Sequence, residues 1–321
     1  MFYRSARTLA QITVLAFMAA TTSVVSAETA VTPLVSVQWL AKNLEEKGQV
    51  LVDLRGQRSY VAGHIPGAVN TDYGLDGWRQ TINKIPGLLP TSGLALDVLV
   101  KKIGQLGVGN TAHVVLIAPG WSAGDMGMAT RLYWSFKVLG HDRVSILDGG
   151  MTAWQADVMP DGKTPRNPIK SGSESNKPKS FVVAIQSHML MDMEDVVAAG
   201  ARGELMLDAR PTMQYMGLQK SSAVRRPGTL PGAISLPGQW LTDNSGGNFR
   251  APEALKKLMA TVGLQDGADM FVFCNTGHWA SITWFVASEL LGQKKARLYD
   301  GSLADWTARN NAPLERKIKL N

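Results

Sequence analysis

The chain contains the same sequence pattern twice, and this duplication restricts its fold to two copies of one domain. An apolar run that ends in Asp-x-Arg occurs at 50–55 (VLVDLR) and again at 205–210 (LMLDAR). A Pro-Gly-Ala turn follows each run, at 66–68 and at 231–233. The repeat is about 140 residues long, which is the length of a whole domain and too long for a solenoid repeat.

Two further matches extend the duplication across both copies. They pair DGGMTAWQA (148–156) with DGSLADWTA (300–308), and HVVLIAPGWS (113–122) with DMFVFCNTGH (269–278). In the second pair, Ala118 stands where the second copy has Cys274, the only cysteine of the chain. The copies therefore differ at the one residue type that is a strong nucleophile.

Residues 160–180 join the two copies and hold almost no large apolar side chain. Their composition, rich in Pro, Ser, Gly and Lys, is typical of an extended linker. We therefore expect one domain at 28–159 and a second at 181–321.

Short apolar runs alternate with helical patterns in each copy. The runs predict buried strands at 49–54, 113–118 and 144–148, and at 204–208, 270–274 and 296–300. The helical patterns, several of which end on glycine, lie at 35–48, 93–107, 128–140, 188–200, 252–263 and 281–292. This alternation predicts an α/β fold in which each copy is a mainly parallel sheet with helices on both faces.

The first 27 residues have the pattern of a secretory signal peptide. Two arginines form a basic start, a mostly apolar run covers 9–20, and Val25-Ser26-Ala27 is a small-x-small cleavage site before Glu28. The apolar run is too short to span a bilayer, and an uncleaved anchor is the alternative. Because the composition is not disulfide-rich, we expect export to a bacterial periplasm, without a membrane span in the mature protein.

Charge and metal-ligand content exclude two classes of function. The net charge is +7, but the basic residues are scattered or lie in the linker, which does not indicate nucleic-acid binding. Five scattered histidines and one cysteine give no zinc-binding spacing. We therefore expect neither a nucleic-acid partner nor a metal.

Cys274 ends a predicted strand, and a tight loop and then a helix follow it directly. The loop is Asn275-Thr276-Gly277-His278-Trp279. Ligands of a parallel sheet bind beyond the carboxyl ends of its strands. Loop amides and the positive end of the helix should converge on the sulfur, lower the thiol pKa and give an exposed nucleophile. The alternatives are a disulfide to another chain and an inert buried thiol.

This arrangement resembles the rhodanese family of sulfurtransferases, as a tandem pair over nearly the whole mature chain. The motifs that carry the resemblance are CNTGHW (274–279), the paired Asp-x-Arg strands, GHIPGA (63–68), GTLPGA (228–233) and the paired DG-x-x-x-x-W closings. The resemblance implies an inactive domain at 28–159, in agreement with Ala118, and a catalytic domain at 181–321.

The family resemblance also implies a mechanism and its partners. Cys274 takes sulfane sulfur from a small anionic donor, and the loop amides stabilise the resulting persulfide. A thiol, cyanide or protein acceptor then removes the sulfur, and no metal or organic cofactor takes part. The donor (thiosulfate, 3-mercaptopyruvate or polysulfide), the acceptor and the oligomeric state are left open.

The charges of the site depart from the family pattern. Thiosulfate-using relatives carry basic residues after the cysteine, whereas Asn275 and Thr276 are neutral, as in the mercaptopyruvate-using branch. Relatives commonly have an arginine where this chain has Gln214, and Trp279 replaces a small or hydroxyl residue. The candidates for the missing cation are Arg225, Arg226 and His278, and His278 is also a candidate for proton transfer.

Arg210 is a further candidate for substrate binding. However, Asp208 and Arg210 recur as Asp53 and Arg55 in the copy that has no cysteine. An ion pair that holds the end of the strand explains both copies better than a role in catalysis.

Two further functions compete with sulfur transfer by an enzyme. A non-enzymatic periplasmic sulfur carrier or binding module on the same scaffold is the main alternative. Phosphatase or arsenate reductase chemistry needs a longer loop and an arginine six residues after the cysteine, where this chain has Ala280.

Overall fold

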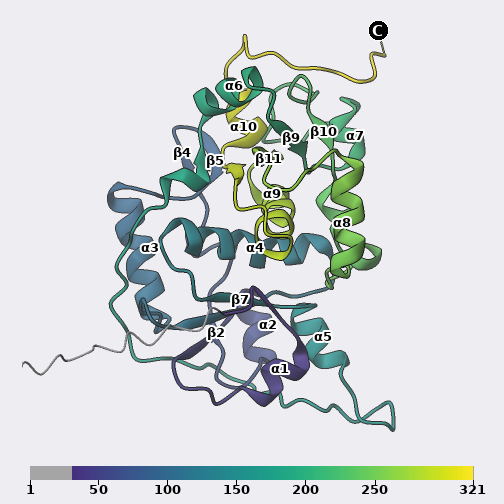
Figure 1. Ribbon diagram of the computed structural model, residues 1–321. Coiled ribbons are helices and arrows are strands. Elements are labelled where there is room, and N and C mark those ends of the chain that lie inside the picture. Colours follow the sequence, from purple (N-terminus) through teal and green to yellow (C-terminus); the bar gives the residue numbers. More distant parts are fainter. Residues whose placement is uncertain (1–30, 321) are drawn as a thin grey trace, which may run out of the picture. The chain divides into compact units, whose positions relative to one another are not determined.

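Each half of the chain forms a five-stranded parallel sheet, as the duplication predicts (Figure 1). The computed structural model describes residues 31–320, so the predicted signal peptide lies outside the described residues. The first sheet has the order β1 (Leu34–Val35), β7 (Val144–Leu147), β6 (His113–Ile117), β2 (Gln49–Asp53) and β3 (Val69–Asn70). The second has the order β8 (Leu190–Met191), β12 (Ala296–Tyr299), β11 (Met270–Phe273), β9 (Leu205–Asp208) and β10 (Ile234–Ser235). When the copies are aligned, the two strand orders are the same.

The central strands are continuous apolar runs because both of their faces are buried. In β6, Val114 and Leu116 face one core, while Val115 and Ile117 face another. The outermost strands have only two residues each, too few for a periodic signal, and the sequence did not predict them.

Helices cover both faces of each sheet, which confirms the predicted fold class. In the first half, α1 (Val37–Lys42) and α5 (Gly150–Ala156) pack on one face, and α3 (Gly93–Gln105) and α4 (Ala123–Val138) on the other. In the second half, α6 (Met193–Ala201) and α10 (Ser302–Trp306) oppose α8 (Pro252–Thr261) and α9 (His278–Phe285). Short helices α2 (Gln57–Ala62) and α7 (Thr212–Tyr215) follow β2 and β9, and a π-helical turn at Val286–Leu290 extends α9.

Helices α4 and α9 pack against each other between the two sheets (Figure 1). One apolar cluster runs from the first half through both helices into the second half. Two hydrogen bonds that join side chain to side chain cross this contact, one between Thr130 Oγ1 and Ser281 Oγ (2.8 Å) and one from the Tyr133 hydroxyl to Glu289 (2.7 Å). The two copies therefore share a core, and the loops before α4 and α9 lie at their contact.

The segment between the two halves contains no strand and no helix from residue 157 to residue 186. It is nevertheless bonded to the first half. Lys170 N donates to His64 O (2.9 Å), Lys179 N to Gly104 O (2.9 Å) and Ala184 N to Leu139 O (3.0 Å). These hydrogen bonds hold the segment between the two halves against the first half.

An antiparallel hairpin that the sequence did not predict follows β3. It consists of β4 (Gln80–Ile82) and β5 (Ile85–Leu88), joined by Asn83 and Lys84, which both have left-handed backbone angles (φ 50° and 67°). Two consecutive left-handed residues are the geometry of a tight hairpin turn. Although the hairpin belongs to the first half, Figure 1 shows it next to α10 of the second half, where Leu89 N donates to Asp300 (2.9 Å).

No helix among residues 31–320 has the length and apolar composition needed to cross a membrane.

Candidate active site

Cys274 directly follows β11, and α9 begins four residues later at His278. Gly277 caps the helix with a left-handed backbone (φ 76°). A Cβ atom at Gly277 would collide with Arg131 Nη1 and lie 2.9 Å from Asp300 Oδ1. Glycine is therefore required here both by the backbone angle and by the close approach of Arg131.

Ser302 fixes the conformation of the cysteine loop. Its Oγ accepts hydrogen bonds from Cys274 N (3.0 Å) and Gly277 N (3.2 Å), and it donates to Tyr299 O (2.8 Å). Ser302 has a left-handed backbone (φ 50°), and its counterpart in the first copy is Gly150 (φ 56°). Sequence reasoning missed Ser302. The two copies differ at this position, with DGS at 300–302 and DGG at 148–150, just as they differ at Cys274 and Ala118.

The remaining amides of the loop are free donors. Within residues 31–320, no hydrogen bond is formed by the backbone N–H groups of Asn275, Thr276, His278, Trp279 and Ala280, either to oxygen or to the sulfur. The last three belong to the first turn of α9, whose dipole adds positive potential. The loop therefore offers unpaired donors and a helix terminus to an anion, although these amides form no hydrogen bond to the sulfur on which the sequence predicted that they converge.

The Cys274 side chain is completely buried, whereas the sequence predicted an exposed nucleophile. The side chain belongs to the buried apolar cluster that also contains Leu207, Val272 and Ala280, and the β4–β5 hairpin of the other half contacts the loop that follows it. A Cβ atom at Gly87 would lie 2.9 Å from Thr276 Cβ and 3.0 Å from Thr276 O, so the two backbones are in contact. The counterpart Ala118 is also buried.

Two arginines of the first half contact the cysteine loop, and sequence reasoning missed both because they belong to the copy without the cysteine. Arg79 Nη2 donates to the Thr276 carbonyl and to Thr276 Oγ1, both at 2.8 Å. Arg131 in α4 is buried and forms an ion pair with Asp300 (2.5 Å). Its guanidinium also stacks on the Trp134 ring at 4.5 Å.

His278 is packed between the two halves as a neutral side chain. Its Nε2 lies 3.0 Å from the Gly124 carbonyl, and its Nδ1 lies 2.7 Å from the Tyr73 hydroxyl. Because a carbonyl only accepts, Nε2 carries the proton and Nδ1 accepts from Tyr73. Burial, followed by the nearby Arg79 charge, lowers the His278 pKa from 6.5 to about 4. His278 is therefore neutral at neutral pH and does not supply the missing cation.

The neutral His278 gives a testable pH dependence. The unfolded chain binds a proton at this residue below pH 6.5 and the folded chain only below about 4, so stability is lost as pH falls between these values. The expected loss is at most about 3 kcal/mol for this residue. His113, whose pKa burial also lowers to about 4, adds to the same slope.

Urea unfolding at several pH values checks this prediction. A His278→Gln variant should lose stability less steeply than the wild type between pH 6.5 and about 4. The same slope in both proteins would show that the folded state tolerates a charged His278.

The other flank of the loop carries no charge. Asn275 Nδ2 donates to the side-chain oxygen of Gln214 (2.8 Å), the residue that stands at the usual arginine position. Trp279 packs between the halves, where a Cβ atom at Gly124 would lie 3.6 Å from its ring and one at Gly238 3.1 Å. Neither Gln214 nor Trp279 offers a cation to a substrate.

Arg210 forms the predicted ion pair. It contacts Asp208 at 2.5 Å and donates to the Gly228 carbonyl at 2.8 Å. In the first half, Arg55 pairs with Asp53 at 2.7 Å and donates to the Gly63 carbonyl at 2.6 Å. The same arrangement in both copies supports a structural role for Arg210 and does not favour its role as a substrate-binding residue.

The side chains of Arg225 and Arg226 donate hydrogen bonds to the segment that follows α10, and their role in substrate binding stays a prediction. Arg225 Nη1 donates to the Ala308 carbonyl (3.3 Å). Arg226 Nη2 donates to the carbonyls of Arg309 (3.0 Å) and Ala312 (2.8 Å). Both side chains hold the segment that follows α10.

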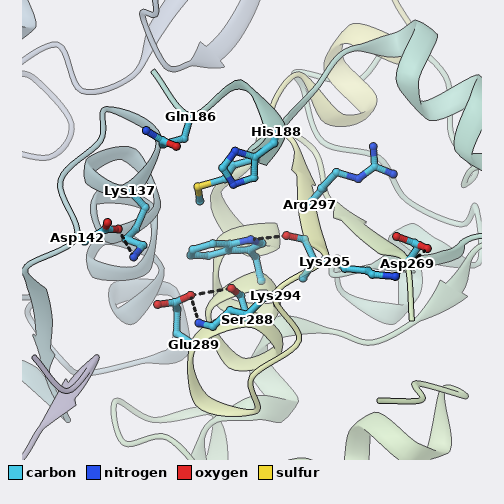
Figure 2. A pocket seen from close by; sticks show the side chains of 13 residues that line it. Lys137, Asp142, Gln186, His188, Asp269, Ser288, Glu289, Lys294, Lys295 and Arg297 are labelled. Atoms are coloured by element: carbon cyan, nitrogen blue, oxygen red, sulfur yellow. Dashed lines mark hydrogen bonds and ion pairs between the residues drawn. The ribbon is translucent and has the colours of Figure 1, made fainter. Parts of the chain in front are cut away.

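A cavity of about 520 Å³ lies at the amino ends of β11 and β12, at the opposite end of β11 from Cys274 (Figure 2). Its lysines are paired with carboxylates: Lys137 with Asp142, Lys294 with Glu289, and Lys295 with Asp269. Because these charges compensate each other, this cavity has less capacity for an anion than the cysteine loop.

Comparison with known proteins identifies the domain type. The family model for the rhodanese-like domain matches the chain twice, at residues 36–157 and 192–309. A putative thiosulfate sulfurtransferase of Mycobacterium tuberculosis is 29% identical over 291 residues, which cover 88% of this chain and 97% of that protein. A thiosulfate sulfurtransferase of Corynebacterium glutamicum is 29% identical over 300 residues, with 88% and 90% covered.

Solved structures show the same fold. The 3-mercaptopyruvate sulfotransferase SseA from Escherichia coli superposes with a TM-score of 0.69 at 24% identity, covering 85% of this chain and 99% of that one. Tum1 from Saccharomyces cerevisiae gives 0.71 at 21% identity, with 89% and 98% covered. The arrangement of two domains is thus shared over nearly the full length of these proteins.

Proposed function

The chain belongs to the rhodanese family, and from this premise we propose that it is a sulfurtransferase that carries sulfane sulfur as a persulfide on Cys274. The names of its relatives, thiosulfate sulfurtransferases, support the activity class. The observation that carries the proposal is the position of Cys274 in a loop of unpaired amides at the start of α9, opposite Ala118 in the other copy.

The proposed reaction has two steps. The Cys274 thiolate attacks the sulfane sulfur of the donor, and a sulfur–sulfur bond forms. The bond from that sulfur to the rest of the donor breaks, and the leaving group keeps the electron pair. Thiosulfate releases sulfite, and polysulfide releases a shortened polysulfide. 3-Mercaptopyruvate releases the pyruvate enolate, which then takes up a proton. A thiolate or cyanide next attacks the terminal sulfur, and Cys274 leaves as the thiolate again.

The residues of the loop supply the electrostatic part of this chemistry. Ser302 holds Cys274 N and Gly277 N, so the free amides keep their directions without a partner. The free N–H groups and the α9 dipole offer positive potential to an anionic donor and to the negative charge of the persulfide. Since this stabilisation is built into the backbone, no side-chain base is needed to hold the charge.

Donor entry requires movement of the cover. Because the sulfur has no exposed surface and the β4–β5 hairpin contacts the loop, the hairpin and the loop have to separate before a donor reaches Cys274. The contacts that must be released include the hydrogen bonds from Arg79 to Thr276 and from Leu89 N to Asp300, and the contact between the Gly87 and Thr276 backbones.

A donor panel with cyanide as the acceptor tests the proposal. Thiosulfate, 3-mercaptopyruvate and polysulfide are each supplied, and thiocyanate formation is measured. We expect at least one donor to give many turnovers per chain. Thiocyanate formation no faster than with the Cys274→Ala variant, for all three donors, would contradict the proposal.

A sulfur carrier is the second candidate, and the burial of Cys274 favours it. A carrier takes up one sulfur per chain and releases it to a specific protein, whereas an enzyme turns over repeatedly with small acceptors. Uptake of one sulfur without turnover on cyanide or thiols supports the carrier.

Export is part of the proposed function. The basic start, the apolar run and the Val25-Ser26-Ala27 site support the proposal that the sulfur transfer takes place in a bacterial periplasm. Fractionation of cells that produce the full chain, followed by N-terminal sequencing, should find a periplasmic protein that begins at Glu28. A cytoplasmic protein that retains its first residues would contradict export.

A further inference from the structure

Arg79 is a cation without a counter-ion at the cysteine loop. Its Nη2 is used by Thr276, its Nε is buried without a hydrogen-bond partner, and no carboxylate of residues 31–320 lies within ion-pair distance. The neighbouring Arg131 differs, because Asp300 neutralises it. A partly buried cation attracts an anion more strongly than an exposed one does, since water screens it less.

The two copies of the fold allow the position of Arg79 to be compared. The Asp of each DG motif accepts a backbone hydrogen bond from the opposite half, Asp300 from Leu89 N (2.9 Å) and Asp148 from Phe249 N (3.0 Å). Leu89 and Phe249 are therefore equivalent residues of the two covering segments.

The strand opposite these equivalent residues shows what corresponds to Arg79. In the hairpin, Gln80 pairs with Leu88, so the antiparallel register puts Arg79 opposite Leu89. The segment 242–249 covers the loop after Ala118 in the same way, because a Cβ atom at Gly247 would collide with the Gly120 carbonyl, and in this segment Thr242 pairs with Phe249. The cover over the cysteine loop thus has an arginine where the cover over the Ala118 loop has a threonine. The arginine is therefore found over the loop that has the cysteine, although Arg79 and Cys274 belong to different halves of the chain.

We propose that Arg79 binds the oxyanion end of the sulfur donor, so that the half without a cysteine supplies the donor specificity of the other half. This inference rests on the proposed function and names its substrate class, a small donor that ends in a carboxylate or a sulfonate. Gln214 brings a neutral side chain to Asn275 of the loop, whereas Arg79 brings a positive charge to Thr276. Polysulfide, which has no oxyanion end, gains less from this contact.

Two alkylating reagents of nearly equal size test the inference without relying on catalysis. Iodoacetate is anionic and iodoacetamide is neutral, and Cys274 is the only cysteine they can modify. The neutral reagent reports the access and ionisation of the thiol, and the ratio of the two rates reports the attraction for an anion. In Arg79→Gln, the iodoacetate-to-iodoacetamide ratio should fall by about tenfold or more.

Two further variants separate charge from structure. Lys84→Gln removes a cation from the exposed turn of the same hairpin and should leave the ratio unchanged. Arg79→Lys keeps the charge without the arginine fork and should recover most of the ratio. With thiosulfate or 3-mercaptopyruvate as donor, Arg79→Gln should raise KM more than it lowers kcat.

The outcomes distinguish this inference from the proposed function. An unchanged ratio in Arg79→Gln, or equal losses for both reagents, overturns the role of Arg79 even if the wild type transfers sulfur. If neither reagent modifies the native protein, the site is closed to small anions and the inference also fails. If the ratio falls as expected but no donor is turned over, only the proposed function fails.

Discussion

Replacing Cys274 by serine should lower thiocyanate formation by at least about three orders of magnitude with every donor. The hydroxyl of serine is not ionised at neutral pH and is a weak acceptor of sulfane sulfur, so neither the first step nor the persulfide remains. No second thiol exists in the chain to replace it. Steady-state thiocyanate formation measures this loss.

The stability of the variant has to be separated from its activity. Because Cys274 is buried, a serine hydroxyl at this position without a partner should cost about 1–3 kcal/mol. Cys274→Ala buries no polar group and is the matched control, with the same loss of activity and a smaller loss of stability. Activity in either variant above a small fraction of the wild type would assign the sulfur transfer to another group.

Replacing Arg210 by methionine should produce the largest loss of stability. The change leaves the Asp208 carboxylate buried without its ion pair and the Gly228 carbonyl without its donor. Removing one partner of a buried pair costs about 3–5 kcal/mol, which lowers Tm by roughly 10 °C in a chain of this size. Thermal unfolding measures the shift.

The first copy provides the control for this prediction. Arg55→Met breaks the same pair, but the Arg55 side chain is 12% exposed, so water reaches the remaining groups. We expect a smaller loss, roughly 1–3 kcal/mol. A loss of activity in Arg210→Met without a loss of stability would indicate that Arg210 contacts the substrate, and equal losses of stability in the two variants would show that the exposure of Arg55 does not weaken its ion pair.

The sequence predicted the elements whose residues face a core over several positions. The six central strands and the helices that cover them appear because Val, Ile, Leu and Phe recur with regular spacing or in continuous runs. The duplication predicted two copies, and the structure adds that the strand order is also duplicated. The Asp208–Arg210 pair was predictable because it recurs in the copy that has no cysteine.

Only those features of the site that depend on the second half of the chain were predictable from the sequence. The position of Cys274 at the end of β11 and the free amides follow from the local sequence, but the burial of the sulfur does not. The cover comes from a hairpin almost 200 residues earlier, whose strands of three and four residues carry no periodic signal. Arg79, Arg131 and Tyr73 reach the loop only through the packing of α4 on α9, a long-range contact with no local sequence pattern.

The half without a cysteine is part of the site in this account. Its hairpin contacts the cysteine loop, Tyr73 donates a hydrogen bond to His278, and Arg79 brings a positive charge to the loop. In this account, the contact between the β4–β5 hairpin and the loop keeps acceptors away from a persulfide on Cys274 until the two separate. Loss of the cysteine from one copy is therefore compatible with selection for both copies.

The most direct test of the account is the intact mass of the wild-type protein after incubation with thiosulfate, 3-mercaptopyruvate or polysulfide and removal of the donor. The account predicts a gain of one sulfur atom with at least one donor, located by peptide mapping at Cys274, reversed by cyanide and absent from Cys274→Ala. A protein that gains no sulfur from any of the three donors, or gains it equally without Cys274, would contradict the central claim.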